Sequence, residues 1–305
     1  MTEIPRGPLV SHWLGGDLVL YPPDHPGNAF FVDSNSGSDT NKGTSWENAL
    51  ATIDAAVNKC TADNGDVAWV HPAHAENLGA DSAIDIDLAG VSVVGIRRGR
   101  LMPTLTATAI AGDCKLAAAG VSIRNLRFLG GVDATTGLIE VSAADCAILD
   151  CEYRDSVDQA TDILITTAAA DRLLVDGFKV FGAAAAGSDS AIALVGADDA
   201  EIRNFYVYGN FAVGAIDCRT TLSARVRVHT GTIWNANASC IAVVDTVGSS
   251  TGFIGPDLQI MLKDNAPNIT TAITGATFQV MDPVYVANLV NEKGMLINWA
   301  ASTHA

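Results

Sequence analysis

A short segment that recurs along most of the chain constrains the fold more than any other feature of this sequence. Its copies read VSVVGI (91–96), VSIRNL (121–126), CAILDC (146–151), LLVDGF (173–178), AEIRNF (200–205), VHTG (228–231) and FIGP (253–256). A small, amide or carboxylate residue marks each copy, and consecutive markers lie 25 to 30 residues apart: Gly95, Asn125, Asp150, Asp176, Asn204, Thr230 and Gly255. This period predicts a solenoid, because each repeat buries its apolar side by stacking on its neighbours.

A second set of segments keeps step with the first. It reads IDIDLAG (84–90), CKLAAAG (114–120), LIEVSAAD (138–145), LITTAAAD (164–171) and IALVGADD (192–199). Each copy has apolar residues, then small residues, then Gly or Asp, so each repeat holds at least two short β-strands and no stretch of helical period. We therefore predict an all-β, parallel β-helix of about seven coils, stacked ~4.8 Å apart. The markers lie at a tight corner, where Asn, Asp and Gly tolerate the bend.

The two ends of the chain depart from the repeat. We predict an extended N-terminal arm (1–28), an entry strand, loop and capping helix (29–64), the β-helix (65–255) and a C-terminal capping or docking segment (256–305). Leu50, Ile53 and Val57 have helical spacing behind Thr44 or Ser45 as the N-cap. The proline-rich arm either packs along the solenoid or grips a neighbouring protein.

Composition excludes several classes of function. The chain has 18 Lys and Arg against 34 Asp and Glu, a net charge of −16, which argues against nucleic-acid binding. No apolar run reaches the length of a membrane span, and no secretory signal is visible, so we expect synthesis in a cytoplasm. The six cysteines lack a CxxC pair and are expected to be reduced. Aromatic residues make up only 6%, and the five tryptophans fall in different segments, which weighs against a platform for stacking sugars.

Two groups of residues resemble metal ligands. Oxygen-bearing side chains alternate at Asp33, Asn35 and Asp39 as in the first part of a calcium loop, but Thr44 stands where an EF-hand has its distal Glu. A polar loop is therefore favoured there. The second group is His71, His74 and Glu76, in which Pro72 prevents a helical HxxH arrangement. We predict no metal and no cofactor.

Catalytic motifs are equally scarce. Glycoside hydrolysis needs two carboxylates across one groove, and the obvious pair, Asp198–Asp199, falls at a turn that the repeat already explains. No catalytic residue is therefore predicted. The basic cluster Arg97, Arg98 and Arg100 begins the longest interval between markers, so residues 97–110 are predicted to project as a loop. Partner-binding residues are predicted in this cluster and in the arm: Trp13, Leu14, Leu18, Arg97, Arg98 and Arg100.

The segment FFVDSNSGSDTNKGTSWENALATIDAAVNKC (30–60), followed by GDVAWVHPA (65–73), resembles the entry segment of right-handed parallel β-helix proteins of the pectin-lyase-like class. Ala73 departs from the pattern, since the class usually has Gly there. The stretches YGNFAVGAIDCRTT (208–221) and DPVYVANLVNEKGMLINW (282–299) also resemble β-helix proteins encoded among the structural genes of tailed bacteriophages.

This resemblance implies a non-enzymatic virion protein on the outer surface of the capsid. Such a decoration or cement protein would bind the major capsid protein or another virion protein through its terminal segments, as a homo-oligomer such as a trimer. Two alternatives stay open. One is a tail-spike-like polysaccharide depolymerase, a glycoside hydrolase or lyase, and the other is a non-catalytic adhesin that binds a host-surface glycan.

Overall fold

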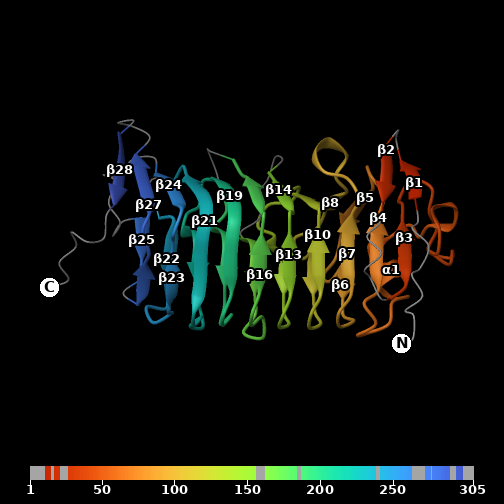
Figure 1. Ribbon diagram of the computed structural model, residues 1–305, viewed down its shortest axis with the longest axis horizontal. Coiled ribbons are helices and arrows are strands. Elements are labelled where there is room, and N and C mark those ends of the chain that lie inside the picture. Colours follow the sequence, from red (N-terminus) through yellow and green to blue (C-terminus); the bar gives the residue numbers. More distant parts are fainter. Residues whose placement is uncertain are drawn as a thin grey trace, which may run out of the picture.

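Strands of successive repeats pair in parallel, so that the chain winds into a right-handed β-helix with three faces. Figure 1 shows the coils side by side along the long axis, with the colours running in chain order from one end to the other. The computed structural model describes residues 11–14, 17–20, 27–155, 162–183, 187–237, 241–262, 272–275, 277–288 and 293–297. No helix in these ranges is long and apolar enough to cross a membrane.

Each face is a ladder of aligned strands. Face 1 contains β3 (Ala29–Val32), β4 (Val67–Val70), β7 (Ser92–Gly95), β10 (Ser122–Arg124), β13 (Ala147–Leu149), β16 (Leu174–Asp176), β23 (Gly252–Ile254) and β26 (Phe278–Val280). Face 2 contains β5 (Ala75–Leu78), β8 (Thr104–Ala107), β11 (Arg127–Leu129), β14 (Glu152–Arg154), β17 (Lys179–Phe181), β24 (Leu258–Leu262) and β27 (Val284–Asn288). Two longer strands, β19 (Glu201–Gly209) and β21 (Val226–Asn235), pass through both faces.

Face 3 is a separate sheet with one strand from each coil. It contains β6 (Ile84–Ile86), β9 (Cys114–Leu116), β12 (Thr136–Val141), β15 (Asp162–Thr166), β18 (Ser190–Leu194), β20 (Gly214–Cys218), β22 (Val243–Asp245) and β25 (Ile273–Thr274). These eight strands define eight coils. The markers indicated about seven coils because the first of them, Gly95, lies in the second coil.

Columns of apolar side chains, one per coil, fill the interior. The face 1 column is Val93, Ile123, Ile148, Val175, Ile202, Val228 and Ile254. The face 2 column is Leu105, Phe128, Tyr153, Val180, Val207, Ile233, Ile260 and Val286. Each fully buried side chain of this kind stabilises the folded chain by roughly 1.5–3 kcal/mol. Every added coil extends the same continuous core.

The marker residues form a column at the corner between faces 1 and 2. Four of them have left-handed backbone: Asn125 (φ 53°), Asp150 (φ 52°), Asn204 (φ 52°) and Thr230 (φ 51°). In the coil that contains β16 the predicted marker is off by a residue. Asp176 pairs with Arg203 inside the strands, so Gly177 (φ 75°) aligns with Asn204 and takes the left-handed position.

The N-terminal capping helix is shorter than predicted. Helix α1 spans Ile53–Val57, and the hydroxyl of Thr52 caps it by accepting a hydrogen bond from a first-turn N–H at 3.2 Å. The prediction of Thr44 or Ser45 as the N-cap was wrong. Leu50 makes a parallel bridge with Val32 of β3, which holds this stretch extended. The described chain also contains two 3-10 turns, η1 (Trp46–Asn48) and η2 (Gly99–Leu101).

Strands continue the coils beyond residue 255, where the sequence analysis ended the β-helix. Strands β24 to β27 stack in parallel on the preceding coils. An antiparallel strand, β28 (Lys293–Ile297), then pairs with β27. Because the free edge of a sheet exposes unpaired backbone groups, this added strand covers the edge of β27 at the C-terminal end of face 2.

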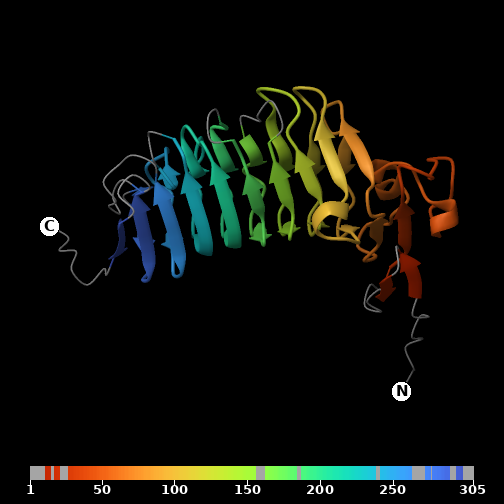
Figure 2. The ribbon, with the colours of Figure 1, turned by 90° about the horizontal axis from the view of Figure 1, so that it is seen from above.

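A hairpin lies at the other end of the molecule. Strands β1 (Ser11–Leu14) and β2 (Asp17–Leu20) pair antiparallel and form a sheet of their own. Figure 2 shows this hairpin beside the red end of the solenoid. The N-terminal arm (1–28) was predicted to be extended, and its described part consists of these two strands and residues 27–28.

Candidate functional site

The acidic loop at residues 33–41 uses its oxygen atoms within the protein. Asp33 accepts hydrogen bonds from the N–H of Asn35 at 2.9 Å and from the hydroxyl of Ser36 at 2.6 Å. Asp39 accepts from the N–H groups of Ala51 and Thr52 at 2.8 and 3.0 Å. Burial raises the pKa of Asp33, but these hydrogen bonds outweigh it, so its pKa lies below the ordinary value. The loop connects β3 to α1, and no group of three or more His, Cys, Asp or Glu in the described chain is arranged to hold a metal.

The histidines predicted as metal candidates have a structural role. The Nδ1 atom of His74 accepts a hydrogen bond from the N–H of Ser34 at 3.0 Å, which leaves Nε2 to donate to Glu76 Oε2 at 3.0 Å. The same Glu76 oxygen accepts from the N–H of Ile53 at 3.0 Å. Both nitrogens of His74 are therefore occupied, and the group ties β5 to the start of α1. His71 Nδ1 lies 3.8 Å from the loop carboxylate of Asp33.

The predicted carboxylate pair is held by an arginine. Two nitrogens of Arg225 each lie 2.7 Å from an oxygen of Asp199, and one lies 3.3 Å from Asp198. The N–H of Ala224 donates to Asp198 at 2.8 Å. Hydrogen bonding by Arg225 lowers the pKa of Asp199, so this group is a poor proton donor. Because glycoside hydrolysis needs a protonated acid beside an ionised carboxylate, the geometry supports a structural turn.

The predicted partner-binding residues lie in two separate places. In the hairpin, Trp13 is directly opposite Leu18, while Leu14 is opposite Asp17. The arginines lie in the connection between β7 and β8, and Arg98 contacts Asp150 at 2.8 Å.

The segment around these arginines differs from its prediction. Residues 97–110 were predicted to project as one loop, but η2 and β8 occupy much of this segment. Strand β8 pairs with β5 and β11, so its residues belong to face 2 rather than to a loop.

A second pair of acids lies beneath Arg219, near face 3. The guanidinium contacts the carboxylate of Asp162, and its Nε lies 3.7 Å from Asp217. Thr246 donates a hydrogen bond to Asp217 at 3.3 Å. The side chains of Asp162 and Asp217 are 2% and 0% exposed, and burial raises the pKa of Asp217 to about 6. A carboxylate without exposed surface cannot meet a polysaccharide directly, so this Arg219 cluster contributes to the cohesion of the coils.

Face 2 carries a band of aromatic side chains that the sequence analysis missed. Two rows of outward-pointing residues run across its strands, and together they form what we call the aromatic face. The first row is Phe181, Tyr208, Trp234 and Met261. The second row is Tyr206, Thr232, Gln259 and Tyr285. The first row is therefore mostly aromatic, and the second places Thr232 and Gln259 between two tyrosines.

Contacts between neighbouring coils hold these rings in position. The Tyr208 and Trp234 centroids are 5.6 Å apart with an interplanar angle of 79°, and those of Phe181 and Tyr206 are 5.6 Å apart at 38°. The guanidinium of Arg154 lies 5.1 Å from the ring centroid of Phe181. Such separations suit favourable aromatic and cation–π contacts. Phe181 nevertheless remains 37% exposed.

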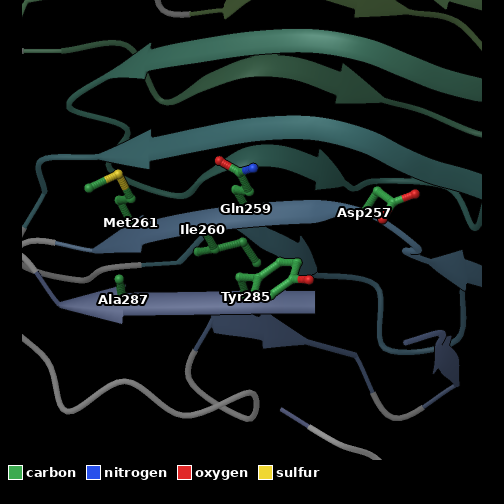
Figure 3. A pocket seen from close by; sticks show the side chains of 6 residues that line it. All are labelled: Asp257, Gln259, Ile260, Met261, Tyr285 and Ala287. Carbon is green, nitrogen blue, oxygen red and sulfur yellow. The ribbon is translucent and has the colours of Figure 1, made fainter. Parts of the chain in front are cut away.

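The band ends in a shallow hollow of about 500 Å³ near the C-terminal end. Figure 3 shows Gln259 and Met261 on β24, with Tyr285 and Ala287 on β27, around this hollow. Asp257, at the start of β24, adds an exposed carboxylate at its edge. Ligand sites commonly have ~300–1,000 Å³ and combine aromatic walls with a few polar groups, so the hollow has the size and lining of a small binding site.

A signal for this face was present in the sequence. Phe181, Tyr208 and Trp234 are separated by 27 and 26 residues, which is one coil each. The tryptophans taken alone show no such column, because the first row mixes Phe, Tyr and Trp. The low aromatic content therefore does not weigh against such a surface, because five of the 19 aromatic residues are gathered on one face.

These strand pairings and faces define the molecule as a parallel β-helix protein. No model of a known protein family matches the chain, and no curated protein matches it. Among solved structures, the chain is similar to one titled "Rhamnogalacturonan lyase", at 10% identity and a TM-score of 0.49, with 89% of this chain and 90% of that chain covered. The fold assignment here is carried by the strand pairings.

Proposed function

We propose that the protein is a non-enzymatic structural component of a bacteriophage virion, which decorates the outer surface of the capsid. The observation that carries the proposal is the β1–β2 hairpin, which pairs with no other strand in the described chain. An isolated two-stranded hairpin is marginally stable in water. A partner surface, such as the major capsid protein, would stabilise the hairpin. The sequence likeness to phage structural proteins in residues 208–221 and 282–299 supports the same role.

The carboxylates support a non-enzymatic role. The pair at Asp198 and Asp199 is bound by Arg225, and the pair at Asp162 and Asp217 is buried under Arg219. An inverting or retaining depolymerase needs one free acid and one free base or nucleophile on a common groove. Neither pair offers that arrangement.

The test is imaging of purified phage particles that carry or lack the gene for this protein. We expect extra density on the capsid of particles with the gene. A Trp13→Asp, Leu18→Asp variant should lose this density, because these two residues lie opposite each other in the hairpin. A Leu222→Asp variant is the control, since Leu222 is 48% exposed and lies outside both predicted partner-binding segments. Density on the tail, or equal attachment of the hairpin variant, would refute the proposal.

A further inference from the structure

The aromatic face differs in charge from the rest of the molecule. From β17 to β27, every outward position of face 2 is uncharged or basic, and the basic residue, Lys179, lies at the end nearest the middle of the solenoid. The preceding strand, β14, carries both Glu152 and Arg154. The chain as a whole has a net charge of −16. Outward strand positions without acids in such a chain, with rings kept partly exposed and Asp257 at the rim of the hollow, have the character of a binding face.

The dimensions of the face suit a linear polymer. Strands β17, β19, β21, β24 and β27 are consecutive neighbours, and at ~4.8 Å per step they span about 19 Å. Two alternate residues along a strand span about 7 Å, so the footprint is on the order of 130 Å², against about 800 Å² per partner in a standard protein interface. The face is too narrow to hold a second copy of the chain by itself.

Its chemistry narrows the class of polymer. The negative net charge disfavours a nucleic acid. A peptide would add to a sheet through unpaired backbone groups, whereas the strands of this face are already paired on both sides. A polysaccharide has flat C–H surfaces that pack on Tyr208 and Trp234 and hydroxyl groups that bond to Thr232 and Gln259.

We propose that the aromatic face binds a linear polysaccharide, which lies across the strands from Phe181 to the hollow at Tyr285 and is not cleaved. The rings of the first row contact sugar C–H groups by face or by edge, because Tyr208 and Trp234 are nearly perpendicular. The polar side chains of the second row bond to hydroxyls. The hollow, with Gln259 and Asp257 at its rim, receives the sugar at one end. This binding stands independently of the virion role, because it depends only on face 2.

The test uses the full chain and a panel of soluble linear oligosaccharides prepared from cellulose, dextran, chitin and alginate. Binding is measured by calorimetry, and released reducing ends are assayed in parallel. We expect at least one member to bind without release of reducing ends. Trp234→Ala should weaken that binding about tenfold, or about 1.4 kcal/mol, and Trp234→Phe should restore most of it.

Phe253→Ala is the matched control, because Phe253 is 42% exposed but lies on face 1. Its affinity should equal that of the unmodified chain, and circular dichroism should show both alanine variants folded. Sedimentation shows whether the chain associates with itself instead of binding an oligosaccharide. The proposal would be overturned if no member of the panel bound, or if Phe253→Ala lost as much affinity as Trp234→Ala. It would also be overturned if the chain formed a dimer that Trp234→Ala dissociates.

Discussion

The buried amide of Asn235 gives the sharpest prediction about what holds the coils together. Its Oδ1 accepts hydrogen bonds from the N–H groups of Phe211 and Asn237 at 3.0 and 2.9 Å. Its Nδ2 donates to the carbonyls of Phe211 and Ile241 at 3.1 and 2.8 Å. With 0% exposure, Asn235 satisfies two donors and two acceptors and connects consecutive coils.

The perturbation is Asn235→Asp, which keeps the shape but replaces the donor nitrogen with an oxygen. Two buried carbonyls then lose their donors, and each such loss costs about 1–3 kcal/mol. We expect a loss of about 2–6 kcal/mol at pH 7.5, to which the buried charge adds. At pH 5 the carboxyl takes up a proton and regains one donor, so about half of the loss should disappear.

Urea unfolding monitored by circular dichroism measures the change, and hydrogen exchange locates it, because stability in a solenoid is set by contacts between neighbouring coils. Weakened protection should centre on β21 and the segment that precedes β22. The control is Asn48→Asp, the same chemical change on an exposed residue. A loss equal to that of the control, or one that grows on acidification, would refute the reasoning.

Two further predictions concern buried acids and backbone contacts. Burial raises the pKa of both Asp113 and Asp217 from 3.8 to about 6, so the stability they contribute is complete below pH 4 and is lost as the pH rises through 6. The free energy of unfolding should therefore be higher at pH 5 than at pH 7.5, by on the order of 1 kcal/mol per group, and the melting temperature should rise with it. Asp113→Asn should remove the contribution of one group, and a stability that falls continuously on acidification would contradict this. Gly112→Ala should destabilise the fold by about 1–3 kcal/mol, because the added Cβ would lie 2.1 Å from the carbonyl oxygen of Leu78. Gly79→Ala, whose nearest contact would be 3.4 Å, should have almost no effect, and equal urea midpoints for the two variants would count against the close approach.

Local patterns in the sequence predicted the coil but not its alignment. Ile123 lies between Ser122 and Arg124, so its inward direction follows from the strand period. The pair Asp176–Gly177 shows the limit. Either residue can occupy a left-handed corner, and only the pairing of Asp176 with Arg203 assigns that place to Gly177. The early start predicted for α1 failed in the same way, because the pairing of Leu50 with β3 overrode helical spacing.

The same distinction applies to the sites. The sequence predicted that the loop at Asp33 is a polar connection, and the hydrogen bonds within it confirm that interpretation. It also suggested a turn at Asp198 and Asp199, but not the arginine that binds them. Arg225 is 26 residues from Asp199, and their contact exists because one coil brings them together.

By itself, the sequence determined that this chain forms a parallel β-helix, since a regular period, small residues at bends and apolar alternation are properties of neighbouring residues. Only the tertiary structure decided which outward side chains meet. Tyr208 and Trp234 become neighbours because each coil returns to the same register, which depends on pairing along the whole turn. A surface such as the aromatic face is therefore a property of the stack, and no single repeat contains it.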